Sequence, residues 1–225
     1  MLARQVARVL GVAVVTAWAL SLSTASAPTA VAATCPDVEV IFARGTSDSP
    51  GIGFVGRAFV DSLKKKLLGK QVSVYAVNYP ASWNFSKSTT AGAVDANKHV
   101  QYVAGMCPQT KIVLGGMSQG AGVIDLITIG NRTIWFFKPA PLPDTMVNHV
   151  AAIAVFGNPS RDVSTLGPLT EISPKYGLKA IDLCATGDPY CSDGNNFFAH
   201  FSYPWNGMVN DAATFTARRV LGLET

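Results

Sequence analysis

Residues 111–127 read KIVLGGMSQGAGVIDLI, and this stretch decides the fold. The apolar run at 111–115 is typical of a buried strand, and residues 121–127 are typical of a helix. Between them, Gly-x-Ser-x-Gly indicates a nucleophile elbow, a sharp turn that exposes a serine hydroxyl, here that of Ser118. Glycines on both sides leave room for the strained backbone of such a turn, and the N–H of Gln119 would face an oxyanion formed there. The alternative is a glycine-rich turn whose serine has no catalytic role. Whether a base and an acid can reach Ser118 decides between the two interpretations.

Strand-like and helix-like segments alternate along the rest of the chain. Apolar runs predict strands over 38–43, 71–77, 111–117, 150–156 and 179–183. Helical spacing of apolar residues predicts helices over 54–66, 96–107 and 209–220, besides the one after Ser118. Continuous apolar strands are typical of a parallel sheet covered on both faces, and the alternation indicates a doubly wound α/β domain.

The first 32 residues have the pattern of a secretion signal. Arg4 and Arg8 precede an almost wholly apolar run over 9–22, and Ala-x-Ala follows at 25–27 and again at 30–32. We expect cleavage after the second of these sites, because a proline directly follows the first. A retained membrane anchor is the alternative, but the apolar run is short for a spanning helix, which needs roughly 20 residues.

Residues 33–225 then form one domain with one substantial core. Removing Arg4 and Arg8 from the 18 basic residues leaves 16 against 14 acidic ones, a net charge of +2. This mild balance gives no reason to expect nucleic acid or an anionic surface as a partner. We expect a secreted monomer, and whether it stays associated with the cell envelope is left open.

Four cysteines follow the signal, and an even count in an exported chain favours two disulfides. Three pairings are possible. Cys184 and Cys191 are close in sequence and would close a small loop, which leaves Cys35 with Cys107. A metal site is the alternative, but no Cys-x-x-Cys occurs and only three histidines are present, so we expect neither a metal nor another cofactor.

A serine hydroxyl needs a base to take its proton, and histidine serves in nearly all such sites. His99 precedes Ser118 on a helix, where we expect it on the surface, and His149 directly precedes a strand, at the wrong edge of the sheet. His200 follows the last strand and can reach the carboxyl edge, where open α/β sheets bind ligands. The chain order serine, acid, histidine also favours His200.

The acid should lie between Ser118 and His200. Asp188 directly follows the last strand inside the loop that a disulfide would close, so its carboxylate would be held rigidly. Asp193 is its main rival, and both aspartates can equally be turn formers. Asp182 lies within a strand and should face a surface of the sheet.

Five motifs together resemble the cutinase family, and more closely its exported bacterial cutinase-like branch. They are CPD at 35–37, FARGT at 42–46, GGMSQGA at 115–121, C-x-x-x-D-x-x-C at 184–191 and AH at 199–200. The resemblance covers roughly residues 35–220, and the combination is highly specific. One departure is Met117, where the family usually has tyrosine; methionine fills similar volume, so we expect little catalytic effect.

The resemblance implies a compact three-layer α/β-hydrolase, with a central five-stranded parallel sheet flanked by helices and no large lid. It also implies a triad of Ser118, Asp188 and His200, and the two disulfides named above. Beside the N–H of Gln119, it implies a second oxyanion donor at Thr46, through its backbone N–H and hydroxyl.

We therefore expect a secreted serine esterase that acts through an acyl-enzyme. Its expected substrates are carboxylic esters: short- to medium-chain acyl esters, lipids or cutin-like polyesters. The alternatives are a lipase, phospholipase or thioesterase acting on cell-envelope lipids, and a non-catalytic exported lipid-binding protein. A histidine base predicts that activity falls as the pH drops below about 6.5, the ordinary pKa of that side chain.

Loop aromatics suggest how a lipid substrate is met. Phe197 and Phe198 stand just before His200, and we expect them to line an acyl-binding mouth or to make transient contact with a lipid surface. Trp83 and Phe85 fit the same role and ordinary burial equally well, and for the aromatic run at 135–137 burial is the favoured interpretation.

Overall fold

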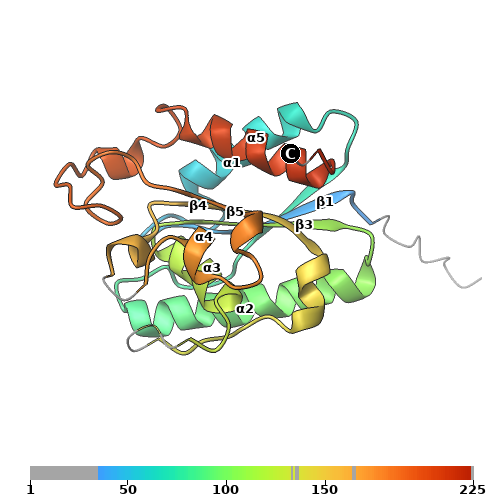
Figure 1. The fold of residues 1–225 in the computed structure, drawn as a ribbon, viewed down its shortest axis with the longest axis horizontal. Helices are drawn as coiled ribbons and strands as arrows, with labels where there is room; N and C mark the ends of the chain where they lie inside the picture. Colours follow the sequence, from blue (N-terminus) through green and yellow to red (C-terminus); the bar gives the residue numbers. More distant parts are fainter. Residues whose placement is uncertain (1–34, 133, 135–136, 164–165, 224–225) are drawn as a thin grey trace, which may run out of the picture. The chain divides into compact units, whose positions relative to one another are not determined.

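The structure is a computed structural model that describes residues 35–132, 134, 137–163 and 166–223 (Figure 1). Its elements are, in chain order, β1 (Val38–Ala43), α1 (Gly53–Lys66), β2 (Val72–Ala76), α2 (Phe85–Met106), β3 (Lys111–Met117), α3 (Gln119–Thr128), η1 (Asp144–Asn148), β4 (Val150–Phe156), η2 (Pro159–Asp162), α4 (Leu169–Ile172), η3 (Gly177–Lys179), β5 (Ala180–Leu183), η4 (Ala199–Phe201) and α5 (Met208–Val220).

The five strands form one parallel sheet in the order β2-β1-β3-β4-β5. This arrangement confirms the α/β fold that the alternation of apolar runs predicts. β1, β3 and β4 have the predicted bounds, while β2 and β5 are slightly shorter. Because all the strands run in one direction, their carboxyl ends meet at one edge of the sheet, where open α/β sheets bind ligands.

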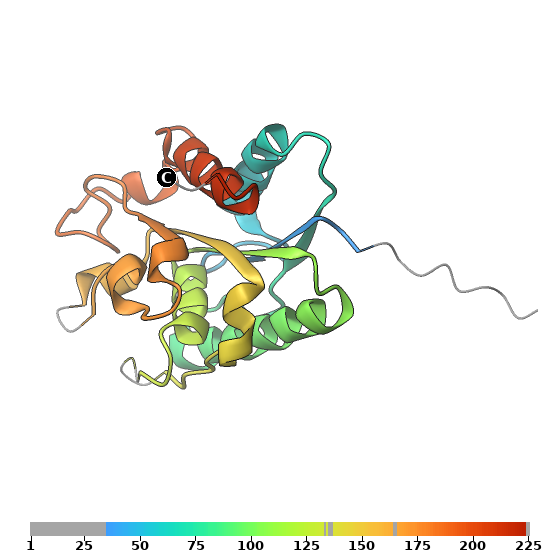
Figure 2. The same ribbon diagram turned by 45° about the vertical axis from the view of Figure 1, so that its right-hand side comes forward.

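Helices cover both faces of the sheet, which makes three layers. In Figure 1, α1 and α5 lie above the sheet and α2 and α3 below it, and Figure 2 shows the same layers after rotation. Each face has its own core, because neighbouring residues of a strand point to opposite sides. Phe42 and Phe156 pack under α1 and α5, whereas Ile41 and Ile153 pack on the side of α2 and α3.

Helix α2 is longer than the sequence predicts. Apolar spacing marks a helix only from Ala96, yet α2 begins at Phe85. Its first half buries small polar side chains, Ser88 and Thr89 among them, and Ser88 Oγ donates a hydrogen bond to Gln119 Oε1 at 3.0 Å. A packing face made of such residues lacks the apolar period that reveals a helix in sequence.

Two disulfides tie the domain together. Cys35 joins Cys107, which links the segment before β1 to the end of α2, with an S–S distance of 1.97 Å. Cys184 joins Cys191 at 2.04 Å and closes the loop directly after β5. In the part of the chain that the structure describes, no three His, Cys, Asp or Glu side chains are grouped to hold a metal ion.

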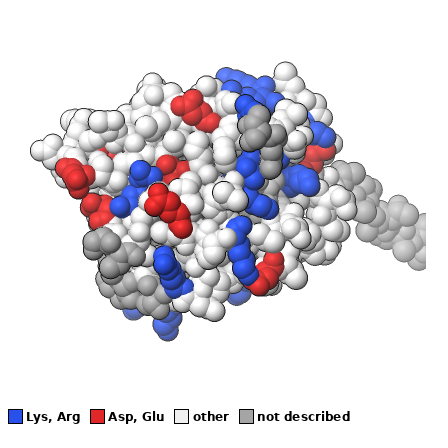
Figure 3. Space-filling view, viewed as in Figure 1, with Lys and Arg blue, Asp and Glu red and all other residues white. Residues whose placement is uncertain are grey.

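Charged side chains of both signs are interspersed on the face drawn in Figure 3. The longest basic run, residues 64–66, lies in the last turn of α1, where cations favour the helix dipole. Among the described residues, no helix combines the length and the apolar character needed to cross a membrane.

His99 is not the surface residue that the sequence predicts. It is only partly exposed on α2, with its Nε2 2.5 Å from Glu39 Oε1. Its ring stacks on Tyr75, with ring centroids 3.4 Å apart. The prediction was wrong because helix periodicity places a residue on a face but does not show what polar groups the neighbouring strands offer to that face.

Candidate active site

Ser118 stands between the carboxyl end of β3 and the first turn of α3. Its φ of 55° and ψ of −118° place it in a region that side chains rarely adopt, so the turn is strained. A Cβ on Gly116 would overlap the backbone of Gly120, and a Cβ on Gly120 would overlap the carbonyl oxygen of Ala43. The two glycines are therefore sterically required, and the turn has the strand–turn–helix context of a nucleophile elbow.

Gln119 is the first residue of α3, so its N–H has no partner within the helix. Its side chain is engaged elsewhere: Nε2 donates to the carbonyl oxygen of Ser82 at 2.9 Å, and Oε1 accepts from Ser88. The side chain thus ties α3 to the start of α2, and the group that Gln119 presents beside Ser118 is its backbone N–H.

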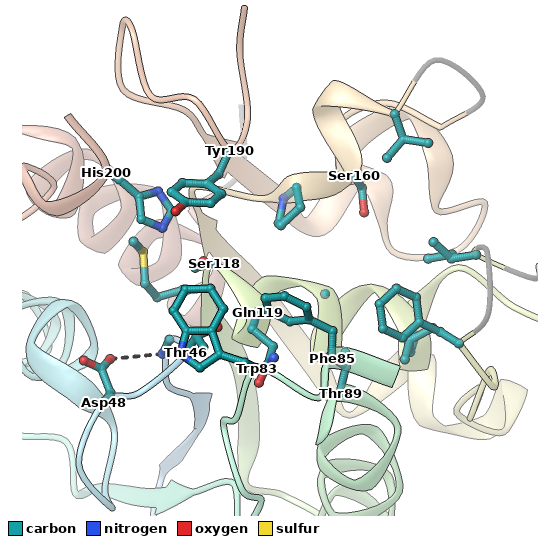
Figure 4. A pocket seen from close by; sticks show the side chains of 18 of the residues that line it. Thr46, Asp48, Trp83, Phe85, Thr89, Ser118, Gln119, Ser160, Tyr190 and His200 are labelled. Atoms are coloured by element: carbon teal, nitrogen blue, oxygen red, sulfur yellow. Dashed lines mark hydrogen bonds between the residues drawn. The ribbon is translucent and has the colours of Figure 1, made fainter. Parts of the chain in front are cut away.

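Thr46 lies in the loop after β1, and hydrogen bonding holds this loop in place. Asp48 Oδ2 accepts from the backbone N–H of Gly45 at 3.0 Å, the dashed line in Figure 4. Burial raises the pKa of Asp48 above its ordinary value, although the Gly45 hydrogen bond opposes the rise. Thr46, Ser118 and Gln119 all line one pocket.

His200 and Asp188 form a buried pair, with Nδ1 and Oδ2 2.8 Å apart. His200 is 5% exposed and Asp188 is fully buried. Tyr203 donates its hydroxyl to the same Oδ2 at 2.6 Å, and the backbone N–H of Tyr190 donates to Oδ1 at 2.9 Å. Because both oxygens have partners, the carboxylate has one orientation, and it orients the imidazole in turn.

The surroundings keep Asp188 ionised. Burial alone raises the pKa of its carboxyl group, but hydrogen bonds from His200, Tyr203 and Tyr190 outweigh burial and lower the pKa below its ordinary value. Asp193, the rival in the sequence, is exposed, and Asp188 is the carboxylate that meets the imidazole.

Gly157, at the end of β4, passes directly beside this pair. It has a positive φ of 57°, and a Cβ there would lie 2.8 Å from His200 Cε1 and 3.2 Å from Asp188 Oδ2. Its N–H donates to the carbonyl oxygen of Leu183 at 2.9 Å, which joins it to β5. The bare backbone therefore forms one wall of the imidazole site.

A buried polar network fixes the chain just after this glycine. Asn158 Nδ2 donates to Asp125 Oδ1 at 3.2 Å and to Asp182 Oδ2 at 3.0 Å. Ser160 donates its hydroxyl to the other oxygen of Asp125. Burial raises the pKa of Asp125 to about 8, so this carboxyl group is mostly protonated at neutral pH and carries little buried charge.

One pocket of about 370 Å³ brings these residues together. In Figure 4, Thr46, Ser118 and Gln119 lie on one side of it and His200 on the other. Most of the remaining lining is apolar: Phe54, Trp83, Phe85, Leu126, Ile134, Phe137, Val163, Tyr190 and Phe201. Apolar walls with a few convergent polar groups are typical of a small-molecule site.

The aromatic residues singled out in the sequence are placed unevenly. Trp83 and Phe85 line the pocket, whereas Phe197 and Phe198 are exposed outside it, 61% and 86% respectively. Phe197 contacts Tyr190, which lines the pocket, with ring centroids 6.2 Å apart. Positions 135 and 136 lie outside the described residues.

Two residues that position the site were missed from the sequence. Tyr203 fixes Asp188, and Asp48 fixes the loop of Thr46. For Tyr203 the sequence offers only a tyrosine close after the histidine, which is a weak signal. The burial that obliges its hydroxyl to find a polar partner is seen only in the structure. For Asp48 no signal was available, since an aspartate in a glycine-rich loop reads as an ordinary turn residue.

The sheet order, the elbow serine and the histidine–aspartate pair at the same edge define an α/β-hydrolase. The model of the family described as Cutinase matches residues 34–220. The chain belongs to the cutinase family.

Curated relatives and solved structures agree with this membership. The chain is 45% identical to Carboxylesterase Culp1 of Mycobacterium tuberculosis over 221 residues, covering 96% of this chain and 97% of that protein. It is 48% identical to Phospholipase Culp4 of the same species over 201 residues, covering 89% and 86%. An acetyl xylan esterase superposes with a TM-score of 0.72 at 27% identity, covering 83% of this chain and all of that one.

A cutinase of Trichoderma reesei, solved with a phosphonate inhibitor, superposes with a TM-score of 0.67 at 29% identity, covering 83% of this chain and 77% of that one. The family and these relatives together make the chain a serine ester hydrolase acting on carboxylic esters.

Proposed function

We propose that Ser118, His200 and Asp188 are the catalytic triad of this esterase, and that it is a secreted enzyme acting on short- to medium-chain acyl esters or lipids. The observation that carries the proposal is the buried His200–Asp188 hydrogen bond of 2.8 Å, on the pocket that Ser118 also lines. A nucleophile, an oriented base and an apolar site for the substrate thus meet in one place.

The reaction proceeds by acyl transfer. His200 takes the proton of Ser118 as the hydroxyl oxygen attacks the ester carbonyl, and the resulting imidazolium gives this proton to the leaving alcohol. Water then attacks the acyl-enzyme with His200 again as base, which releases the acid and restores Ser118. Asp188 holds the tautomer with the proton on Nδ1 and stabilises the imidazolium.

The negative charge that develops on the carbonyl oxygen is stabilised by hydrogen-bond donors. The N–H of Gln119 and the N–H and hydroxyl of Thr46 take this role, because both residues line the pocket beside Ser118. Each well-placed donor contributes roughly 3 kcal/mol to stabilising the transition state. The hydrogen bond that the N–H of Gly45 donates to Asp48 holds the Thr46 loop in place before the substrate arrives.

An organophosphonate ester tests the assignment directly. The label is expected on the peptide that carries Ser118 and should be absent from folded Ser118→Ala. Ser160 lines the same pocket, so it is an internal comparison. Labelling of Ser160 instead, or of neither serine in folded protein that hydrolyses esters, would contradict the proposal.

Secretion is part of the proposal. The signal-like pattern of residues 1–32 lies outside the described residues, while the two disulfides suit an oxidising compartment. N-terminal sequencing of protein exported by a bacterial host should begin at Ala33. An uncleaved chain in the membrane fraction would instead support a retained anchor.

A phospholipase is the second candidate. The relative named Phospholipase Culp4 favours it, and so do exposed aromatics near the pocket mouth, such as Phe201 at 51% and Trp205 at 78% exposure. A panel of simple esters, thioesters and phospholipids, each compared with Ser118→Ala, separates these activities. Ligand binding without turnover or labelling would favour a lipid carrier.

A further inference from the structure

The pocket extends well beyond the reacting groups, along one face of α3. Ser118, Gly122 and Leu126 all line it, and they are spaced four residues apart. Residues with this spacing lie above one another on a helix. With a rise of about 1.5 Å per residue, this face leads from the nucleophile to Leu126 over about 12 Å.

Gly122 leaves a gap in this face of α3, because it has no side chain. Every other residue of α3 is buried, whereas Gly122 is partly exposed to the pocket. A Cβ added there would meet only Thr89 Cγ2, at an ordinary contact distance of 3.6 Å. Glycine is therefore not required by the packing of the helix, unlike the glycines beside Ser118, and what it leaves free is space in the pocket.

The walls beside this space are apolar. Phe85 and Thr89 border it from the first turns of α2, and Figure 4 places both on the same side of the pocket as Gln119. Ile134 and Phe137 line the pocket as well, and Ile134 and Leu126 are both buried parts of one core cluster. An alkyl chain lying there would exchange contact with water for contact with these mainly apolar side chains, which is favourable.

We propose that Gly122 is a specificity-determining residue: its missing side chain lets the acyl chain of the substrate run from Ser118 along α3 to Leu126. This inference rests on the proposed function and adds the acyl class that the site accepts. An extended alkyl chain advances about 1.3 Å per carbon, since its bonds of about 1.5 Å follow a zigzag. A path of about 12 Å therefore holds on the order of nine carbons.

The test uses substitutions that fill the space. Gly122→Ala and Gly122→Leu are measured against wild type with p-nitrophenyl esters from acetate to laurate. Gly122 lies about 6 Å along the helix from Ser118, so a leucine there stops the path after roughly four to five carbons. We expect the ratio of kcat/KM for decanoate to that for butyrate to fall at least tenfold in Gly122→Leu, with a smaller fall in Gly122→Ala.

Gly105→Leu is the matched control. Gly105 is also a helical glycine, on α2, but it is exposed, and a Cβ there meets nothing within 4 Å. Replacing a helical glycine removes a penalty of about 1 kcal/mol in either place, so neither leucine variant should lose stability through the helix backbone. The control should keep the wild-type ratio of decanoate to butyrate.

The outcomes separate this inference from the proposed function. If Ser118 is labelled by the phosphonate but folded Gly122→Leu keeps the wild-type ratio, the acyl chain lies elsewhere and only this inference fails. An equal loss on both esters also overturns it. Should Gly122→Leu not fold, an unchanged ratio in Gly122→Ala overturns it too. If wild type hydrolyses no ester and Ser118 is not labelled, the proposed function fails and this inference fails with it.

Discussion

The described part of the chain pairs a histidine with a carboxylate at two places, near opposite edges of the sheet. His200 meets Asp188 at the carboxyl edge of the sheet, 2.8 Å apart. His99 meets Glu39 near the amino end of β1, 2.5 Å apart. As isolated pairs the two are nearly the same chemistry, and the hydrogen-bond length does not tell which one is part of an active site.

The difference lies in what surrounds each imidazole. His99 stacks on Tyr75 and approaches Tyr102, and the hydroxyl of Ser73 donates to its partner Glu39 at 2.9 Å. His200 instead lines a pocket that it shares with a serine held in a strained turn. A histidine–carboxylate pair can act as a catalytic base only where the fold also supplies a nucleophile and space for a substrate, which is why we propose this role for His200 and not for His99.

Replacing each histidine by glutamine has the largest expected effect on activity and tests the comparison directly. His200→Gln should lower kcat/KM for an ester by roughly ten-thousand-fold or more, because no base remains for Ser118. His99→Gln should keep activity within about twofold and lose only stability, by about 1 kcal/mol. Ester hydrolysis and urea denaturation measure both, and a large activity loss in folded His99→Gln would contradict the division of roles.

The two disulfides extend the comparison. Cys35–Cys107 lies in the region of His99 and Glu39, and Cys184–Cys191 closes the loop of Asp188. Replacing Cys35 and Cys107 by serine removes a cross-link between residues 72 positions apart and should cost roughly 4.5 kcal/mol of stability. We expect little change in kcat at temperatures where this variant is folded. Replacing Cys184 and Cys191 should cost less stability, roughly 2.5 kcal/mol, but should lower kcat because Asp188 lies in that loop.

The readouts are the midpoint of denaturation and the turnover of the folded fraction. Equal turnover in the two double variants would show that the second disulfide does not position Asp188.

A wall made of bare backbone is present at only one of the two pairs. Gly157→Ala should lower kcat by roughly ten- to a hundredfold with a smaller change in KM, because the added Cβ displaces the imidazole of His200 from the reacting geometry. Gly130→Ala is the control: Gly130 also has a positive φ, of 76°, but a Cβ there meets nothing within 4 Å.

Both substitutions carry the strain of alanine at positive φ, roughly 1 kcal/mol. Only Gly157→Ala should also lose activity, and an equal loss in the control would mean that strain alone is responsible.

The smallest expected effect concerns the pair of His99 and Glu39, which lies away from the pocket. This pair should make the stability of the protein depend on pH. The hydrogen bond from His99 lowers the pKa of Glu39 below its ordinary value of 4.5, with a further contribution from Ser73, although burial opposes the shift. A lowered carboxyl pKa in the folded protein stabilises it above the unfolded-state pKa, and this stability is lost as the pH falls through the folded-state value.

Glu39→Gln should therefore be less stable than wild type by about 1 kcal/mol at pH 7, and the difference should shrink below about pH 4.5. Denaturation curves from pH 7 to 3 measure it. A difference that stays constant over this range would show that Glu39 stabilises the fold without its charge.

Much of the fold and of the site could be predicted from local patterns. Strands with two apolar faces are near-continuous apolar runs, so β3 and β4 were found with their bounds. The elbow was found because backbone sterics demand glycine on both sides of Ser118. Chain order and strand position singled out His200 among three histidines, although its catalytic role stays a prediction.

Other features depend on groups that only the folded chain brings together. Local sequence patterns left Asp188 and Asp193 both open, and only the family resemblance pointed to Asp188. The tertiary structure places Asp188 against the imidazole, with Tyr203 as an unforeseen partner. Likewise, nothing local distinguishes Gly122, which opens into the pocket, from Gly157, which makes room for His200.

The amino-acid sequence by itself determined the strands, the elbow and the family, because these follow from apolar periodicity and from the sterics of neighbouring residues. Only the tertiary structure decided which side chains hold the carboxylate of Asp188, which backbone forms the wall beside His200 and which free space adjoins Ser118. Those are contacts between segments far apart in the chain, and local periodicity carries no information about them.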